Sequence, residues 1–175
     1  MSTSILSRVT QFYETHTYPN YPLLAKPRWQ DGFLAAPQMC RQLASQLTPY
    51  LLAQTGRGRA TLIVGAGEIL PYIVRRWDSS GIDCLDISAR SLRRARFRLA
   101  LQFKPTQFIH QDIDRYITSC DRQYSHIDAY GVLHHLAQPT TTLLQLSRLL
   151  QPGGTMRVMV YNRDARRWIH QFQRI

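Results

Sequence analysis

Short apolar runs alternate with amphipathic segments through most of the chain. Five of the runs have the β-branched composition and flanking turn residues of buried strands. They cover residues 60–64, 82–87, 107–110, 127–132 and 155–161. Segments between them carry apolar residues at intervals of three or four, which predicts helices. These cover residues 69–77, 88–103 and 140–150. This alternation predicts an α/β fold, a doubly wound parallel sheet with helices on both faces.

The N-terminal region departs from this alternation. Residues 1–36 interleave aromatic residues with prolines, and proline interrupts helices because it lacks an amide hydrogen. We therefore expect a lead-in with one short helix at 4–14, followed by an irregular aromatic segment. Residues 37–175 then form the folded domain, with further helices expected at 38–47 and from residue 163 onward.

A glycine turn and an aspartate stand at the ends of the first two predicted strands. Gly65-Ala66-Gly67 leads into a helix, where glycines let the backbone approach a ligand and the helix N-terminus offers N–H groups. Asp86 ends the second strand, and a carboxylate there can accept both hydroxyls of a ribose. Leu70 occupies the third glycine position of a dinucleotide fingerprint, which disfavours NAD. The glycine turn and Asp86 together predict an adenosine-containing ligand. The alternative is a tight turn beside a solvated aspartate.

The order of several motifs carries a family resemblance. Four of them are Val64-Gly65-Ala66-Gly67, Leu85-Asp86-Ile87-Ser88, Gln111-Asp112-Ile113 and Ile127-Asp128-Ala129-Tyr130-Gly131-Val132-Leu133-His134-His135-Leu136. A fifth, Leu149-Leu150-Gln151-Pro152-Gly153-Gly154, matches the turn before the last predicted strand. In these motifs the chain, from about residue 62 to 175, resembles the class I S-adenosylmethionine-dependent methyltransferases. Tyr18-Pro19-Asn20-Tyr21-Pro22 resembles the aromatic-proline lead-in of a bacterial subgroup.

The resemblance implies S-adenosyl-L-methionine as the cofactor and methyl transfer to an acceptor that the motifs do not identify. The implied cofactor-binding residues are Gly65, Ala66, Gly67, Asp86, Ile87, Asp112, Ile113, Gly131 and Val132. Among them Asp86 would bind the ribose hydroxyls, and Asp112 would accept from the adenine amino group. His134, just after the fourth strand, is a candidate general base near neutral pH. The alternative is that His134 holds its loop through hydrogen bonds.

Two departures from the family pattern favour a different function. The family's third glycine falls at Ile69, whose β-branched side chain is expected to crowd a loop that suits glycine. The family's last two strands are absent, so we expect a partner chain or a missing segment to cover the fifth strand's edge. The alternative is therefore a degenerate, non-catalytic methyltransferase-fold module that binds a protein partner or RNA.

Basic residues are concentrated in one helix. The chain has 22 Lys+Arg residues against 11 Asp+Glu, a net charge of +11, yet no acid lies between residues 87 and 111. Arg90, Arg94 and Arg98 recur every four residues in that interval. This spacing predicts a stripe that binds an anionic partner such as RNA. A solvated, Arg-rich helix face is the alternative.

Composition excludes several other classes. Three widely spaced cysteines argue against a disulfide framework, and the histidines lack the spacing of a metal site. There is neither an apolar run long enough to span a membrane nor a signal peptide. We therefore expect a cytoplasmic protein that neither enters a membrane nor binds a metal.

Overall fold

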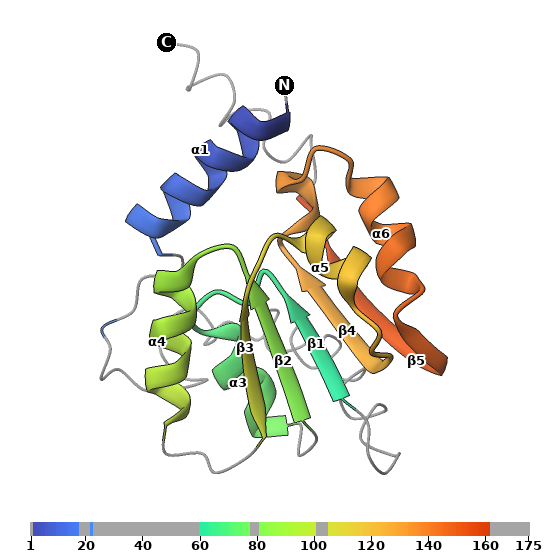
Figure 1. Ribbon diagram of the computed structural model, residues 1–175. Helices are drawn as coiled ribbons and strands as arrows, with labels where there is room; N and C mark the ends of the chain where they lie inside the picture. The colour runs from blue at the N-terminus through green and yellow to red at the C-terminus, as the bar shows by residue number, and fades with distance from the viewer. Residues whose placement is uncertain (1, 18–21, 23–59, 78–80, 101–104, 162–175) are drawn as a thin grey trace.

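The fold is built on one five-stranded sheet, seen in a computed structural model of the chain (Figure 1). The structure describes residues 2–17, 22, 60–77, 81–100 and 105–161. The strands are β1 (Ala60–Val64), β2 (Gly81–Asp86), β3 (Thr106–His110), β4 (Tyr124–Tyr130) and β5 (Leu150–Met159). All neighbouring pairs are parallel, in the order β3-β2-β1-β4-β5. The strand order changes direction between β1 and β4, which confirms the predicted doubly wound fold. Such switch points are where ligands bind in open α/β sheets.

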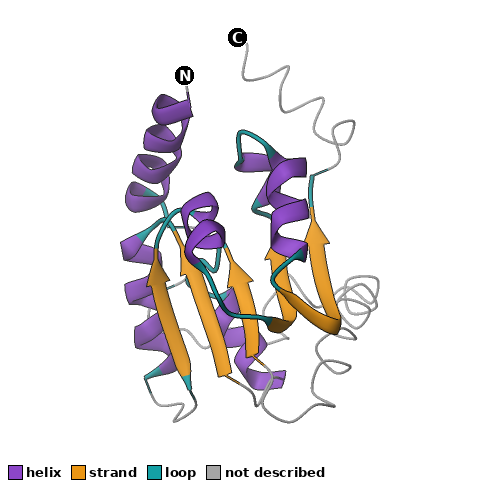
Figure 2. Cartoon of the chain, turned by 45° about the vertical axis from the view of Figure 1, so that its right-hand side comes forward, coloured by secondary structure: helices purple, strands orange, loops and turns teal. Residues whose placement is uncertain are grey.

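Helices cover both faces of the sheet (Figure 2). The helices are α3 (Leu70–Trp77), α4 (Ala89–Leu99), α5 (Ile113–Ser119) and α6 (Pro139–Ser147). α3 and α4 pack on one face around Ile63, Cys84 and Leu92. α5 and α6 pack on the other, around Leu62 and Ile127. Because both faces are covered, β1 is buried along almost its whole length, as its continuous apolar run predicts.

One helix lies outside these layers, at the carboxyl ends of the strands. This is α1 (Ser2–Thr15), which stands next to the start of α4 (Figures 1 and 2). It confirms the helix predicted at 4–14. The predicted aromatic segment lies outside the described residues except for residues 15–17 and Pro22, and the helices expected at 38–47 and from residue 163 onward also lie outside them.

The last strand begins earlier than expected. β5 extends back to Leu150, so that Pro152-Gly153-Gly154 lies inside the strand instead of ahead of it. A register shift between the pairs Tyr124–Leu150 and His126–Thr155 accommodates the extra residues. The turn motif therefore forms an irregularity within the strand, and α6 ends earlier than predicted, at Ser147.

Two short elements were not predicted. α5 has 7 residues and buries only Ile113 and Tyr116, which is too little pattern to reveal a helical period. The second is η1 (Leu133–His135), a single 3-10 turn after β4. Among the described residues, no helix combines the length and apolar character needed to cross a membrane.

Candidate functional site

The glycine turn after β1 requires its glycines. Gly65 and Gly67 have φ angles of 63° and 57°, in the left-handed region that side chains disfavour. A Cβ atom on Gly65 would lie 2.8 Å from both Cβ and Cγ2 of Val132. The turn therefore lies directly against the residues that follow β4. The close approach brings the end of β1 to the switch point of the sheet.

Asp86 connects this turn to the end of β2. Its side chain is 9% exposed, and its Oδ2 accepts a hydrogen bond of 2.7 Å from the backbone N–H of Gly67. Its Oδ1 accepts one of 2.7 Å from the N–H of Ser88. Burial raises the pKa of the Asp86 carboxyl, and the two N–H donors partly offset this rise. A carboxylate has about four acceptor positions, so two remain after these backbone bonds.

Glu68 holds the same turn against α4. The Glu68 side chain is 0% exposed, and Arg94 and Arg98 both form ion pairs with it. The distance from Arg98 Nη2 to Glu68 Oε1 is 3.2 Å, and the Arg98 side chain is 3% exposed. Two arginines of the predicted stripe thus have an internal partner. The reason is helical geometry: a step of four residues exceeds one turn of 3.6, so the stripe rotates from solvent into the protein.

Ile69 does not distort the turn. No residue other than glycine has a positive φ among those described, so the Ile69 backbone is unstrained. Its side chain is 8% exposed and belongs to the buried core. The expected crowding at the family's third glycine position was therefore wrong, because the helix side of this turn has an ordinary conformation here.

The end of α1 is joined to the start of α4 by reciprocal hydrogen bonds. Glu14 Oε1 accepts from the backbone N–H groups of Ala89 and Arg90. Arg90 Nη1 in turn donates to the carbonyls of Glu14, at 3.2 Å, and Thr15, at 3.1 Å. Each helix end thereby receives the groups that its unpaired backbone atoms need. These bonds fix the end of α1 at the start of α4, close to Asp86, which lies two residues before the α4 N-cap Ser88.

A group of rings lies at the ends of β4 and β5. The hydroxyl of Tyr13 and Nε2 of His135 are 3.1 Å apart, so α1 also contacts η1. The His134 ring centroid lies 4.1 Å from that of His135 and 4.1 Å from that of Tyr161. His134 is half-buried at this edge of the sheet. The candidate general base thus stands at the switch point, packed between two rings.

The remaining predicted residues lie along the same edge. Asp112 caps α5: its Oδ1 accepts from the N–H groups of Asp114, at 3.0 Å, and Arg115, at 3.2 Å. Its other oxygen, Oδ2, has no hydrogen bond to a described residue. Ile113 packs in the core, and Ala66 is buried with its N–H bonded to the Leu85 carbonyl at 3.0 Å.

Two predicted residues follow β2 and β4, the strands on either side of β1 and its glycine turn. The Ile87 side chain is half-buried after β2, and Gly131 has a φ of 76° after β4. The Gly131 N–H donates to the Met159 carbonyl at 3.0 Å, which ties the end of β4 to β5. The structure therefore brings the predicted glycines, Asp86 and Val132 into contact, with Asp112 and Gly131 on either side.

The comparison with known families decides which family this is. The methyltransferase domain model matches residues 62–156, more than half of the chain. This chain belongs to the methyltransferase-domain family. The matched range runs from β1 to β5 and includes the glycine turn, Asp86 and His134.

Curated relatives of this methyltransferase-domain chain are considerably longer. An uncharacterized protein from Synechococcus sp. is 27% identical over 99% of this chain and 41% of its own length. The ubiquinone biosynthesis O-methyltransferase of Klebsiella pneumoniae is 24% identical over 64% of this chain and 46% of its own length. The chain thus spans less than half the length of both relatives.

Solved methyltransferase structures share the fold. The N-methyltransferase NodS from Bradyrhizobium japonicum superposes with a TM-score of 0.60, at 20% identity, over 78% of this chain and 77% of that one. Magnesium protoporphyrin IX methyltransferase from Synechocystis, solved with bound SAM, gives a TM-score of 0.60 at 15% identity over 84% and 72%. At these identities the likeness establishes the architecture alone.

The residues of this methyltransferase-domain chain fit the chemistry of S-adenosyl-L-methionine. Asp86 is a buried carboxylate whose hydrogen bonds among the described residues come only from backbone amides, which leaves acceptor positions for ribose hydroxyls. At Gly65 a side chain would collide with Val132, so the turn presents bare backbone where β1 meets the end of β4. Ile87 and the free oxygen of Asp112 offer an apolar contact and an acceptor for an adenine. No group of His, Cys, Asp and Glu suited to a metal occurs in the described part of the chain.

Sequence reasoning missed the groups that hold this site in place. Glu68 follows Gly67 directly, but its arginine partners lie 26 and 30 residues later, so the local sequence gave no signal of the contact. Glu14 gave no local signal, because its partners at the start of α4 are 75 and 76 residues away. His135 likewise meets Tyr13 across 122 residues of sequence.

Proposed function

We propose that this chain binds S-adenosyl-L-methionine at the carboxyl ends of β1 and β2 and transfers its methyl group to an acceptor. The observation that carries the proposal is the Asp86 carboxylate, buried and held by the amides of Gly67 and Ser88. Membership in the methyltransferase-domain family supports the same reading. Relatives that bear the name O-methyltransferase and N-methyltransferase are both among the similar proteins.

Each residue of the proposed site has a distinct task. Asp86 accepts from the ribose hydroxyls, Gly65 and Gly67 admit the methionine portion, and Asp112 accepts from the adenine amino group. Ile87 and Val132 supply apolar contact on either side. The cofactor, when bound, supplies a methyl group on a positively charged sulfur. Because such a methyl group needs no acid to activate it, the main task of the protein is to position the acceptor.

His134 is the proposed base for an acceptor that must lose a proton. A neutral imidazole accepts a proton near pH 7, and His134 belongs to η1, the turn that directly follows Gly131 and Val132 at the end of β4. Its packing between His135 and Tyr161 restrains its orientation. An acceptor with a free electron pair needs no base. A His134→Ala variant that lowers the rate for a hydroxyl acceptor and leaves cofactor affinity intact would support this role.

Calorimetric titration with S-adenosyl-L-homocysteine tests the proposal. We expect the full chain to bind it and the Asp86→Ala variant to lose at least about 100-fold in affinity, since two charge-assisted hydrogen bonds contribute about 3 kcal/mol or more. Asp121→Ala is the matched control: it removes the same charge from an exposed position before β4. Absence of binding by the folded wild-type chain would overturn the proposal and favour the non-catalytic module.

A further inference from the structure

The outward face of α4 presents basic and aromatic side chains together. We call this surface, formed by Arg93, Arg96 and Phe97 with Phe108 of β3 beside them, the α4 outer face. Arg93 and Arg96 are exposed, and Phe97 is 54% exposed. The guanidinium carbon of Arg96 lies 5.1 Å from the centre of the Phe108 ring. The face therefore combines two positive charges with one exposed aromatic ring, that of Phe97, while Phe108 lies half-buried beneath Arg96.

Two other arginines of this helix share an internal carboxylate, whereas Arg93 and Arg96 do not. Arg94 and Arg98 share the buried carboxylate of Glu68. For Arg93 and Arg96, the described residues provide no carboxylate within ion-pair distance. The sequence from residue 87 to 111 contains no acid that could supply one locally. Within the described part of the chain, the exposed, unpaired positive charge of α4 therefore lies at Arg93 and Arg96, and not along the predicted stripe of Arg90, Arg94 and Arg98.

The helical period explains why these residues share one face. Steps of three and four residues, from Arg93 to Arg96 and Phe97, keep side chains on one side of a helix. Arg90, one step earlier, is also exposed, but its guanidinium is engaged with the end of α1 and Glu14 lies beside it. Arg90 therefore stands at the rim of the surface, and Arg93 and Arg96 form its centre.

We propose that the α4 outer face is a docking surface for single-stranded RNA. Two uncompensated guanidinium groups match the phosphates of the backbone. The exposed ring of Phe97 matches unpaired bases, whose π-faces are free to stack. A duplex hides its bases, so the aromatic part of the surface discriminates in favour of single strands. Binding at this face requires no cofactor and is independent of the proposed methyl transfer.

Fluorescence anisotropy with a labelled oligouridine of about 12 nucleotides tests the surface on the full chain. We expect Arg93→Ala/Arg96→Ala to weaken binding roughly tenfold at about 50 mM salt and to reduce the slope of log K against log salt by about 1.4. Phe97→Ala should weaken binding roughly fivefold through lost stacking, with an unchanged salt slope.

The matched control is Arg115→Ala/Arg148→Ala, which removes two exposed arginines from other helices and leaves the net charge equal to that of the test variant. Equal losses of RNA affinity in the two double variants would show that only the net charge of the protein matters, and would overturn the proposal. Unchanged affinity in Arg93→Ala/Arg96→Ala would overturn it as well. So would equal binding of a matched RNA duplex, or tighter binding of phosphatidylglycerol vesicles than of the oligonucleotide. Thermal melting checks that each variant is folded.

Discussion

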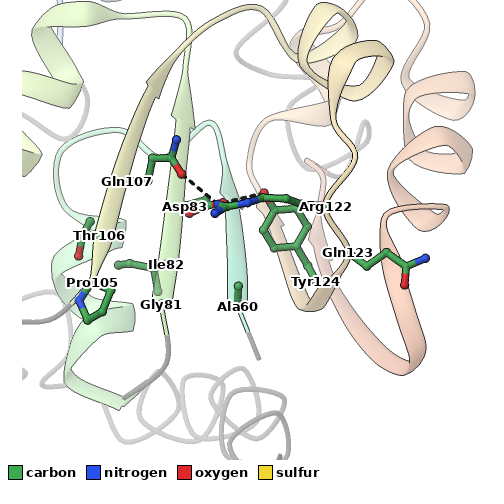
Figure 3. A pocket seen from close by; sticks show the side chains of 10 residues that line it. All are labelled: Ala60, Gly81, Ile82, Asp83, Pro105, Thr106, Gln107, Arg122, Gln123 and Tyr124. Atoms are coloured by element: carbon green, nitrogen blue, oxygen red, sulfur yellow. Dashed lines mark hydrogen bonds and ion pairs between the residues drawn. The ribbon is translucent and has the colours of Figure 1, made fainter. Parts of the chain in front are cut away.

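Two aspartates on β2, one in the middle of the strand and one at its carboxyl end, have contrasting environments. Both are buried: Asp83 is 4% exposed and Asp86 9%. Asp83 Oδ2 accepts from side chains, at 2.6 Å from Arg122 Nη1 and 2.7 Å from the Tyr124 hydroxyl (Figure 3). Among the residues that the structure describes, Asp86 accepts from backbone amides alone. The side chains around Asp83 balance its charge and fix its orientation within the protein. The Asp86 carboxylate, held by backbone amides, keeps acceptor positions for a ligand.

The side chains around Asp83 form a continuous chain of hydrogen bonds. Burial raises the pKa of the Tyr124 hydroxyl, so Tyr124 stays protonated and donates to Asp83. The Tyr116 hydroxyl then contacts that of Tyr124, and Arg122 also donates to Gln107 Oε1 at 2.9 Å. The chain borders a cavity of about 510 Å³ at the amino ends of the strands (Figure 3). It links β2, β3 and β4 and contributes to the fold at the edge opposite the glycine turn.

The contrast between these aspartates is sharpest when each becomes asparagine. Asp86→Asn should lower affinity for S-adenosyl-L-homocysteine by about 100-fold or more, because a neutral amide is a weaker and less versatile acceptor. Its effect on the free energy of unfolding should be small. Asp83→Asn should leave affinity unchanged and cost about 1–3 kcal/mol of stability, chiefly through the buried Tyr124 hydroxyl. Water takes over for Arg122, whose side chain is 60% exposed, so that ion pair contributes little.

Calorimetry and urea unfolding of the same two variants measure the crossed pattern. Tyr124→Phe is the control for Asp83: it removes the donor and should reproduce most of the stability loss without any charge change. The comparison breaks if Asp83→Asn weakens ligand binding as strongly as Asp86→Asn does. It also breaks if Asp86→Asn destabilises the protein more than Asp83→Asn.

Glu68 combines features of Asp83 and Asp86, and its substitution should weaken ligand binding less than substitution of Asp86 does. Like Asp83 it is engaged by arginine side chains, and like Asp86 it belongs to the glycine turn. Glu68→Gln should cost about 3 kcal/mol of stability, because Arg98 is left buried with a neutral partner. Affinity for S-adenosyl-L-homocysteine should fall roughly three- to tenfold, since the ligand must then order the loosened turn.

Glutamine keeps the size of the side chain, so packing is nearly unchanged in that variant. Arg94→Met offers a matched test, because Arg94 is the more exposed partner, at 16%, and Arg98 still pairs with Glu68. Arg94→Met should lose less stability and less affinity than Glu68→Gln. The ratio of the affinity loss to the stability loss should be the same in both variants. A stability loss with fully retained affinity would place Glu68 with Asp83, as a purely structural carboxylate.

Sequence patterns predicted the parts of this molecule that local physics determines. β1 is buried on both faces and therefore appears as a continuous apolar run, and Asp86 was located because it follows such a run in β2. α5 escaped detection because only Ile113 and Tyr116 mark its buried side. The early start of β5 also went unpredicted, since a Pro-Gly-Gly sequence ordinarily interrupts a strand.

Contacts between distant segments account for the rest. The arginine stripe was expected to bind an anionic partner or to face solvent, whereas its four-residue spacing rotates Arg98 toward Glu68, 30 residues earlier. The arrangement of α1 depends on Glu14 and Tyr13, whose partners lie 75 or more residues away. A local pattern contains no information on which of many compatible groups will be its partner, so these assignments required the three-dimensional structure.

The smallest predicted effect is a pH dependence that separates binding from stability. Because burial raises the pKa of Asp86 above the ordinary 3.8, this carboxyl takes up a proton at a higher pH than an exposed aspartate. Protonation removes acceptor positions, so affinity for S-adenosyl-L-homocysteine should fall severalfold during acidification from pH 7, before pH 3.8 is reached. The folded state binds this proton more tightly than the unfolded state. The stability contribution of Asp86 is therefore greatest at low pH and is lost as the pH rises through the folded pKa.

Calorimetry and thermal melting over the same pH series measure both quantities. Asp86→Asn, assayed at higher ligand concentration, should show a nearly flat affinity over this range, since an amide does not titrate. Asp128 is also buried with a raised pKa, and it pairs with Arg157 through two hydrogen bonds between β4 and β5. Protonation of Asp128 alters stability without changing the glycine turn. Affinity must therefore be measured directly and not inferred from melting temperatures. An equal fall in affinity in wild type and Asp86→Asn would show that another group controls binding, and the distinction between the two β2 aspartates would then rest on the substitution data alone.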